Sequence, residues 1–203
     1  MPVQTIRRKD LDKDRLTKIM TNNQKSWLNK IPPHIGHYLT GFTDGEGSFS
    51  ASLRKRKDHT MGWQIALTFN VSQRDKTVLV LLKRHLGCGR LTQRRDGVWN
   101  YTVHNVLAIS DRIIPFFQKY KFLSSKSIRN FSLFRRIVKK VINHDHLTSE
   151  GLKEILILRE ELNKGRGRKR KYAFHDYLKS LSKNPQRLYA RPRAFRDEKH
   201  KRG

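Results

Sequence analysis

An eleven-residue stretch, WQIALTFNVSQ (63–73), alternates large apolar side chains with polar or small ones throughout. Alternation of this kind places every apolar side chain on one face of an extended strand, so it predicts a β-strand that is buried on that face only. Residues 49–53 alternate in the same way, and the polar segment KRKDHTMG separates the two stretches. Together they predict an antiparallel hairpin with a polar, basic outer face.

A second hairpin and a series of helices follow from the remaining patterns. The hairpin comprises residues 88–94 and 98–104 around the turn RDG, and apolar spacing predicts helices over 35–44, 75–86, 105–114, 124–142 and 148–164. Gly87 is expected to cap the second helix, Pro115 to end the third, Ile128 to lie on the buried stripe of the fourth, and Thr148 to cap the last. This order predicts an α+β fold of αββαββα type, in which an antiparallel four-stranded sheet carries helices on one face.

Composition divides the chain into three regions. Residues 1–33 form a basic N-terminal extension, 34–165 a core with strong periodicity, and 166–203 a basic tail in which YAFHDYLKSL predicts a short helix. Cys88 is the only cysteine, so an internal disulfide is excluded. No apolar run approaches the roughly 18 residues of a membrane span, and the N-terminal residues lack the hydrophobic stretch of a secretory signal. We therefore expect a soluble intracellular protein without a membrane partner.

The charge balance indicates a polyanionic partner. Forty-five Lys and Arg residues face 17 Asp and Glu residues, which gives a formal net charge of +28. Nucleic acid explains this excess best, although a ribosomal or membrane-surface protein would be equally basic. The outward positions of the first hairpin carry no acid, so this sheet face is the expected DNA-binding surface. Its predicted contact residues are Ser50, Ser52, Arg54, Arg56, Gln64, Thr68, Asn70, Thr92, Arg94 and Asn100.

Two acids stand on a glycine-rich segment, GFTDGEGSF (41–49), at the edge of this basic surface. A calcium-binding loop that starts at Asp44 would need an acid at its twelfth position. That position holds Lys55, so a calcium-binding loop is excluded. One alternative is a helix-to-strand turn, in which glycines adopt positive φ and Asp44 caps the turn. The other is a site for Mg²⁺, because the ion would offset the repulsion between a carboxylate and DNA phosphate and would suit phosphodiester hydrolysis. Gly41 and Gly45, spaced by four, would let two such helices pack closely.

The segment YLTGFTDGEGSF resembles the signature of the LAGLIDADG homing endonucleases, and the αββαββα order, with LTFNVSQ and KFLSSKS, is similar to the single-motif members encoded in organellar introns. The resemblance implies that Glu46 binds the metal with the carbonyl of Gly45, and that Mn²⁺ can replace Mg²⁺. It also implies that Gln73 positions solvent, that Lys126 faces the active site, and that Asp44 has a secondary catalytic role. The implied dimer interface comprises Tyr38, Gly41, Phe42 and Gly45.

Two positions depart from the family pattern. Family members commonly have Asp where this chain has Glu46, whose longer side chain would shift the metal slightly. At a position where some relatives carry a basic residue, this chain has Thr77, so Arg74 or Lys76 is expected to supply the positive charge.

Two further segments have simpler interpretations. HDH (144–146) predicts a polar loop and not a zinc site, because a second pair of ligands is missing. GRGRKRK (165–171) predicts additional phosphate contacts.

The chain carries one copy of the motif, and cutting two strands requires two acidic sites, so a homodimer on double-stranded DNA is expected. The predicted function is site-specific, Mg²⁺-dependent double-strand cleavage of a long pseudo-palindromic target for intron homing, with 3′ overhangs implied by the family. A chloroplast or mitochondrion is the expected location, and a bacterial cytoplasm also fits. The alternative is a non-catalytic binder on the same scaffold, either an intron RNA maturase or a transcription regulator.

Overall fold

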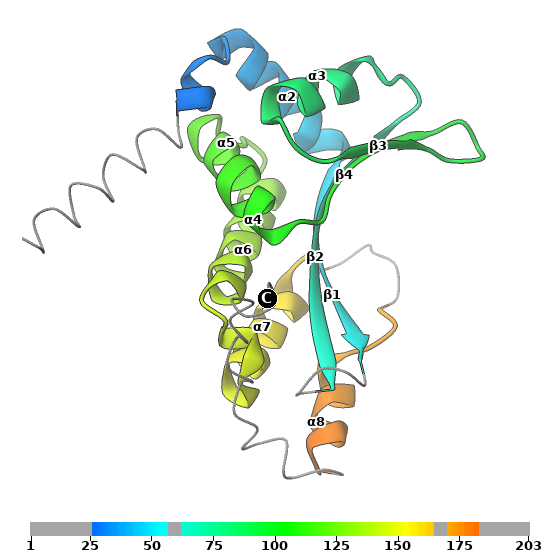
Figure 1. Ribbon diagram of the computed structural model, residues 1–203, viewed down its shortest axis with the longest axis vertical. Helices are drawn as coiled ribbons and strands as arrows, with labels where there is room; N and C mark the ends of the chain where they lie inside the picture. The colour runs from blue at the N-terminus through cyan, green and yellow to red at the C-terminus, as the bar shows by residue number, and fades with distance from the viewer. Residues whose placement is uncertain (1–25, 57–61, 165–169, 183–203) are drawn as a thin grey trace, which may run out of the picture.

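The computed structural model describes residues 26–56, 62–164 and 170–182. Three predicted regions therefore lie wholly or largely outside the described residues: residues 1–25 of the N-terminal extension, most of GRGRKRK, and the end of the tail. A four-stranded antiparallel sheet with strand order β1-β2-β4-β3 forms the centre of the fold (Figure 1). Its strands are β1 (Gly47–Lys55), β2 (Trp63–Gln73), β3 (Arg90–Gln93) and β4 (Trp99–Val103). The predicted α+β fold with two hairpins is thus confirmed.

The period-two prediction for the sheet is also confirmed. Phe49 pairs with Phe69 and Leu53 with Ile65 across β1 and β2, and these side chains are buried. Ser50 and Thr68, which pair between them, lie on the opposite face. Helices line the apolar face of the sheet on one side in Figure 1, whereas the polar face is left uncovered by them.

Aromatic side chains fill the core beneath the start of β1. The ring of Phe49 lies 5.2 Å from that of Phe69 and 5.0 Å from that of Phe134, centroid to centroid. It also contacts the rings of Phe117 and Phe131 at 5.8 and 5.6 Å. Phe49 ends the acidic segment, three residues after Glu46, so this segment is anchored in the aromatic cluster.

Helix α2 (Pro33–Glu46) precedes β1, and α3 (Thr77–Leu86) connects the hairpins. Gly87 caps α3 in the left-handed conformation with φ of 64°, as predicted. The structure corrects the helix that was expected to end before Pro115: α4 (Val106–Ala108), a π-helical turn (Ile109–Ile113) and α5 (Ile114–Lys119) follow one another directly. Pro115 is the second residue of α5, and it has no N–H to bond a carbonyl of the π-helical turn that precedes it.

Three helices complete the fold: α6 (Ser125–Ile142), α7 (Ser149–Glu161) and α8 (Phe174–Ser182). Thr148 caps α7 as predicted, since its hydroxyl accepts a hydrogen bond from the N–H of Gly151 at 3.1 Å. The placement of Ile128 on the buried stripe of α6 was wrong, because its side chain is half exposed at the start of the helix. The short helix predicted within the tail is α8, and its Tyr177 is fully buried. Among the described helices, none has the length and apolarity to cross a membrane.

Candidate functional site

The polar face of the sheet presents most of the predicted DNA-contacting residues together. Strand pairing sets Ser50 beside Thr68, Arg54 beside Gln64, and Thr92 beside Asn100; Ser52 and Asn70 share their face. Arg56 follows β1 directly, and its guanidinium donates to the Gln64 side-chain oxygen at 3.4 Å. Arg94 is the exception, since it lies in the turn after β3 and pairs with Asp96 at 2.6 Å. None of the outward positions on the four described strands is acidic.

Further polar side chains on this face were missed by the sequence prediction. The hydroxyl of Ser72 donates to the side-chain oxygen of Asn100 at 2.6 Å, and Thr68 exchanges a hydrogen bond of 3.0 Å with His104. These bonds cross between β2, β4 and the residue that follows β4, so they fix neighbouring side chains in one orientation. The alternation of β2 already pointed to Ser72, whereas His104 lies beyond the end of β4 and carries no periodic signal.

The acidic segment is the end of a helix and not a turn. Helix α2 continues through Glu46, and Gly47 begins β1 with φ of −88°. The prediction of a glycine turn with positive φ, and of a helix that ends near Asp44, was therefore wrong. Gly47 is needed for space: a Cβ at this position would lie 2.4 Å from the Thr43 methyl group. Its N–H donates to the carbonyl of Thr43, which continues the helical hydrogen bonding into the strand.

Asp44 joins the end of α2 to the beginning of α6. Its carboxylate accepts a 3.1 Å hydrogen bond from the N–H of Ser124 and a second bond from the Ser124 hydroxyl. Partial burial raises the pKa of Asp44, but the hydrogen bonds from Ser124 and Ser127 outweigh it, so this pKa lies below its usual value. The predicted turn-capping role of Asp44 is thus replaced by capping of another helix.

Glu46, Gln73 and Lys126, the predicted catalytic residues, lie at the same end of the sheet. Gly47 pairs with Val71, so the end of α2 lies beside the end of β2, where Gln73 is the last residue. Lys126 is the second residue of α6, directly after the Ser124 cap that Asp44 holds. Glu46 is exposed, and within the described ranges its carboxylate makes no hydrogen bond or ion pair. The main-chain oxygen of Gly45 belongs to the last turn of α2, where carbonyl groups lack helical partners.

Thr77, which stands where some relatives carry a basic residue, is engaged in local hydrogen bonds. Its N–H and hydroxyl both donate to Asp75, at 2.8 and 2.7 Å. The ammonium of Lys76 lies over the ring of Trp99 at 5.1 Å, whereas Arg74 is exposed at the end of β2. Arg74 is therefore better placed than Lys76 to reach a ligand at this end of the sheet.

A groove of about 1090 Å³ runs beside the free edge of β1 and opens near this end. Its walls are β1, the first turns of α6 and the segment that follows α7. The cationic side chains along it are Lys126, Arg129, Arg159, Lys164, Arg170 and Lys171, and Asp44 is the acid that lines it. The groove thus extends the positive surface from the sheet face toward the acidic residues, as a phosphate backbone requires.

One stripe of α2 has no packing partners among the described residues. Tyr38 is 52% exposed, and a Cβ added to Gly41 or Gly45 would meet no atom of the described residues within 4 Å. Phe42, the remaining predicted interface residue, is partly buried against the core. Gly36 differs, because a Cβ there would lie 2.3 Å from the Tyr120 ring. The small residues on the outer side of α2 therefore have no role in the packing of the described residues.

The segment HDH was expected to be a polar loop. It leads into a short 3₁₀ turn (Asp145–Leu147) between α6 and α7. Within the described ranges, the chain holds no group of three or more His, Cys, Asp or Glu side chains arranged for a metal. Any metal at the Glu46 end must therefore be completed by other oxygens, such as main-chain carbonyls, water, phosphate or a second subunit.

Comparison with known proteins connects this arrangement to one family. A family model for LAGLIDADG endonuclease matches residues 39–138. The solved archaeal intron-encoded homing endonuclease I-Vdi141I, in complex with DNA, is 32% identical and has a TM-score of 0.68, with 73% of this chain and 94% of that chain covered. The solved homing endonuclease I-TnaI is 28% identical with a TM-score of 0.62, and 75% of this chain and 97% of that chain are covered.

A curated relative from Neurospora crassa, described as "Probable intron-encoded endonuclease 2", is 30% identical over 169 residues, or 77% of this chain. The chain spans only 37% of that protein, and 24% of a second one from the same organism. Homing endonuclease I-ApeII of Aeropyrum pernix is 31% identical over 103 residues, which are 50% of this chain and 60% of that protein.

Proposed function

Because this chain belongs to the LAGLIDADG endonuclease family, we propose that it is a site-specific DNA endonuclease that cuts both strands of a long pseudo-palindromic target. One observation carries the proposal: a carboxylate that has no partner among the described residues, Glu46, stands at the end of a sheet face whose strands carry no acid. A protein that only bound nucleic acid would gain nothing from this acid, which repels phosphate unless a cation lies between them.

The residues at this end fit a divalent metal ion of the Mg²⁺ type, with Mn²⁺ as a substitute. The Glu46 carboxylate and the Gly45 carbonyl are hard oxygen donors, and Mg²⁺ prefers a few such ligands together with water. Glu46 is exposed, so its side chain can turn toward DNA phosphate. When bound, the ion would act as a Lewis acid on the scissile phosphate and lower the pKa of a coordinated water.

Gln73 and Lys126 have separate tasks in this proposal. The side-chain oxygen of Gln73 accepts a hydrogen bond from the N–H of Arg74 at 2.8 Å. This bond orients the amide and leaves its NH₂ group free to hold a water molecule for attack on phosphorus. Lys126 carries a positive charge at the exposed start of α6, where it can offset the charge that develops on the phosphate. Asp44 acts indirectly, because it holds the start of α6 through Ser124.

The functional unit in this proposal is a homodimer. One chain supplies one acidic segment, and two strands must be cut, so a second copy is needed. The exposed stripe of α2 with Tyr38, Gly41 and Gly45 suits pairing with its own copy, since glycines let helix backbones approach closely. The pairing would set two Glu46 side chains close to the symmetry axis and would favour a target with matching two-fold symmetry.

Intron homing is the proposed biological role, since relatives are named as intron-encoded endonucleases. An organelle is the proposed location, and a bacterial cytoplasm is the alternative. A maturase or regulator on the same scaffold would use the sheet face alone and would have no use for Glu46.

The proposed function is tested by selecting cleaved sites from a randomised duplex library in the presence of Mg²⁺, followed by Glu46→Gln. The isosteric amide keeps the shape but loses the charge that holds a divalent ion. We expect the substitution to abolish cleavage while duplex binding in a gel-shift assay is retained. Glu150→Gln, which changes an exposed acid at the start of α7, serves as the matched control and should cut normally. Unaltered cutting by Glu46→Gln would remove Glu46 from the mechanism, and a pool that binds without being cut would favour the non-catalytic alternative.

A further inference from the structure

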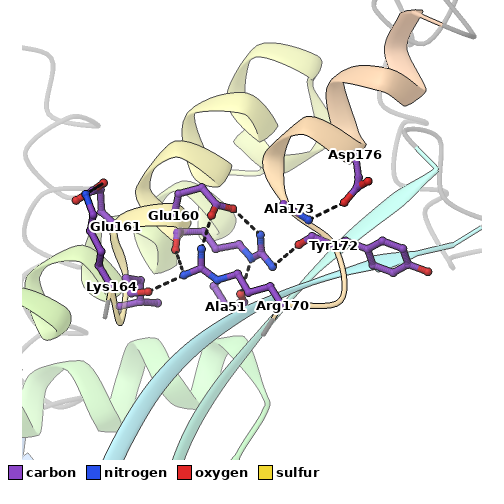
Figure 2. Close-up of polar contacts among 10 residues, drawn as sticks. Ala51, Glu160, Glu161, Lys164, Arg170, Tyr172, Ala173 and Asp176 are labelled. Carbon is purple, nitrogen blue, oxygen red and sulfur yellow. Dashed lines mark hydrogen bonds and ion pairs between the residues drawn. The ribbon is translucent and has the colours of Figure 1, made fainter. Parts of the chain in front are cut away.

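A cluster of charged side chains, with Arg159 buried and Glu160 and Arg170 partly buried, fastens the segment after α7 to the edge of the sheet (Figure 2). The guanidinium of Arg159 is 3% exposed, and its Nε donates to the carbonyl of Ala51 on β1 at 2.9 Å. One of its terminal nitrogens donates to the carbonyl of Tyr172 at 2.8 Å. The pKa of Arg159 is lowered overall, because burial and the neighbouring Arg170 outweigh the opposite effect of Glu160. Arg159 thus joins α7, β1 and residue 172 at one point.

Arg170 closes this arrangement from the other side. Its guanidinium donates to the carbonyls of Arg159 and Leu162 at 2.6 and 2.7 Å, where α7 ends. Glu160 accepts a hydrogen bond from Arg159 at 2.9 Å and another from Arg170. We call Arg159, Glu160 and Arg170 the clasp. It satisfies carbonyl groups that the end of a helix otherwise leaves open, and each charge in it has an opposite partner.

Beyond the clasp, residues 170–182 pack against the end of the first hairpin that is farther from Glu46. The indole N–H of Trp63 donates to the hydroxyl of Ser180 at 2.8 Å, and the Trp63 ring meets those of Tyr172 and Tyr177 edge-on at 5.3 and 6.4 Å. Tyr177 donates in turn to the carbonyl of Ser149 on α7 at 3.2 Å. The ammonium of Lys55 lies over the Trp63 and Tyr172 rings at 5.4 and 5.3 Å.

The position of these contacts along the sheet separates them from the acidic end. Lys55 pairs with Trp63 and Arg54 with Gln64, at the opposite end of the hairpin from the Gly47–Val71 pair beside Glu46. Arg54, Arg56 and Gln64 therefore project from the part of the hairpin that residues 170–182 support. A two-stranded ribbon bends easily when it extends alone from a sheet, and bidentate contacts to bases tolerate little displacement.

We propose that residues 170–182, held by the clasp, are a brace that positions the outer half of the first hairpin and so determines specificity at the outer base pairs of each half-site. This inference rests on the proposed function. In this scheme, Arg159 and Arg170 act through Arg54, Arg56 and Gln64 and do not contact the bases themselves.

The first test needs no DNA. Amide hydrogen exchange is compared between the full chain, Arg170→Ala and Lys179→Ala. Lys179 is an exposed cation on α8 that lies outside the clasp, so its variant removes the same charge. We expect faster exchange in Arg170→Ala at residues 52–55 and 62–66, and exchange like that of the parent at residues 47–49 and 69–73. Glu160→Gln, a milder change, should give the same pattern with smaller amplitude. Uniform acceleration along both strands, or no change, would overturn the brace.

The second test measures specificity. The target selected by the parent chain is altered one base pair at a time, and cleavage of each duplex is compared for the same variants. For Arg170→Ala we expect discrimination to fall about tenfold at the outer positions, the loss of roughly one good base contact, and to persist at the central positions. Lys179→Ala should keep the parental profile. Equal losses at all positions would indicate simple destabilisation and would contradict the inference. If the parent cuts no duplex, the proposed function fails, and the exchange experiment still decides whether the brace exists.

Discussion

Asp44 at the end of α2 accepts hydrogen bonds from both the N–H and the hydroxyl of Ser124, so one carboxylate joins the helix that carries Glu46 to the helix that carries Lys126. Asp44 and Ser124 are 80 positions apart in the sequence. Their contact fixes the acidic end of the sheet relative to the start of α6. In this contact Asp44 acts as a structural acid, whereas Glu46 has no such partner among the described residues.

Asp44→Asn should lower the stability of the protein and move Lys126. The amide cannot accept both hydrogen bonds as a carboxylate does, and loss of a helix-capping acceptor costs about 1 kcal/mol. Urea unfolding followed by circular dichroism measures this cost. Cleavage should fall while metal affinity, measured by calorimetry, stays close to that of the parent. A large loss of metal affinity would mean that Asp44 is a ligand.

The pH dependence of unfolding provides a separate test of the same contact. The pKa of Asp44 lies below its usual value in the folded state, so its contribution to stability is present above the unfolded pKa, about 3.9. This contribution is lost as the pH falls through the folded value. We expect the difference in unfolding free energy between the parent and Asp44→Asn to be constant from pH 5 to 7 and to shrink below about pH 4. A difference that grows toward acid pH would contradict the assignment.

Gly41→Leu should break the proposed dimer without unfolding the subunit. A Cβ at Gly41 meets no atom of the described residues within 4 Å, but a leucine side chain there would keep two α2 helices apart. Sedimentation velocity is expected to show a monomer, and cleavage of both strands should be lost. Ser132→Leu adds the same side chain at an exposed position of α6 and should remain dimeric. A parent chain that sediments at 24.0 kDa and binds DNA as one subunit per site would rule out the dimer.

The groove and the sheet face should respond differently to loss of a cation. Lys171→Ala removes a charge from the wall of the groove, so we expect weaker binding to all duplexes and a salt-dependence slope reduced by about one. Arg54→Ala removes an outward side chain of β1, and it should cost about 1–3 kcal/mol and relax preference at one position of each half-site. Fluorescence anisotropy with matched and mismatched duplexes at several salt concentrations separates the two effects. A change of sequence preference in Lys171→Ala would place that residue at the bases.

Ser180→Ala should destabilise the protein through Trp63. The Trp63 side chain is 2% exposed, and its N–H would lose its acceptor, which costs about 1–3 kcal/mol. The double variant Trp63→Phe/Ser180→Ala removes donor and acceptor together. Its free energy of unfolding should therefore be only slightly lower than that of Trp63→Phe alone. Ser182→Ala, which removes an exposed hydroxyl of the same helix, should be nearly neutral. Urea unfolding of the parent, the two single variants at Trp63 and Ser180, and their double variant gives the coupling energy between the two residues directly.

Periodicity predicted the sheet well because each strand buries one face, and this requirement fixes every second residue of β1 and β2. It failed where a bond to a distant residue or to the backbone decided the outcome. The segment after Asp44 has the composition of a turn, but the Gly47 N–H bonds to Thr43 and prolongs the helix. The π-helical turn before Pro115 keeps the chain helical past a residue that normally ends a helix. Such effects depend on the three-dimensional surroundings.

In the candidate site, too, the sequence pattern indicated positions within elements but not contacts between distant residues. The structure sets Glu46, Gln73 and Lys126 at one end of the sheet because each lies near the end of its own element. Their catalytic roles remain predictions. The partner of Asp44 and the clasp were not predicted, because Ser124 is 80 residues from Asp44 and Arg159 is 108 residues from the Ala51 carbonyl that it binds, and neither pair leaves a periodic signal.

The direct passage from α2 into β1 has a geometric consequence for the target. Glu46 ends the helix and Gly47 begins the strand, so no loop separates the helix from the sheet. In a dimer built on α2, the crossing angle of the paired helices would therefore set the angle between the two sheets and the distance between their outer ends. Substitutions along the outer stripe of α2 could thereby alter the length of DNA that the protein spans, without changing any residue that contacts a base.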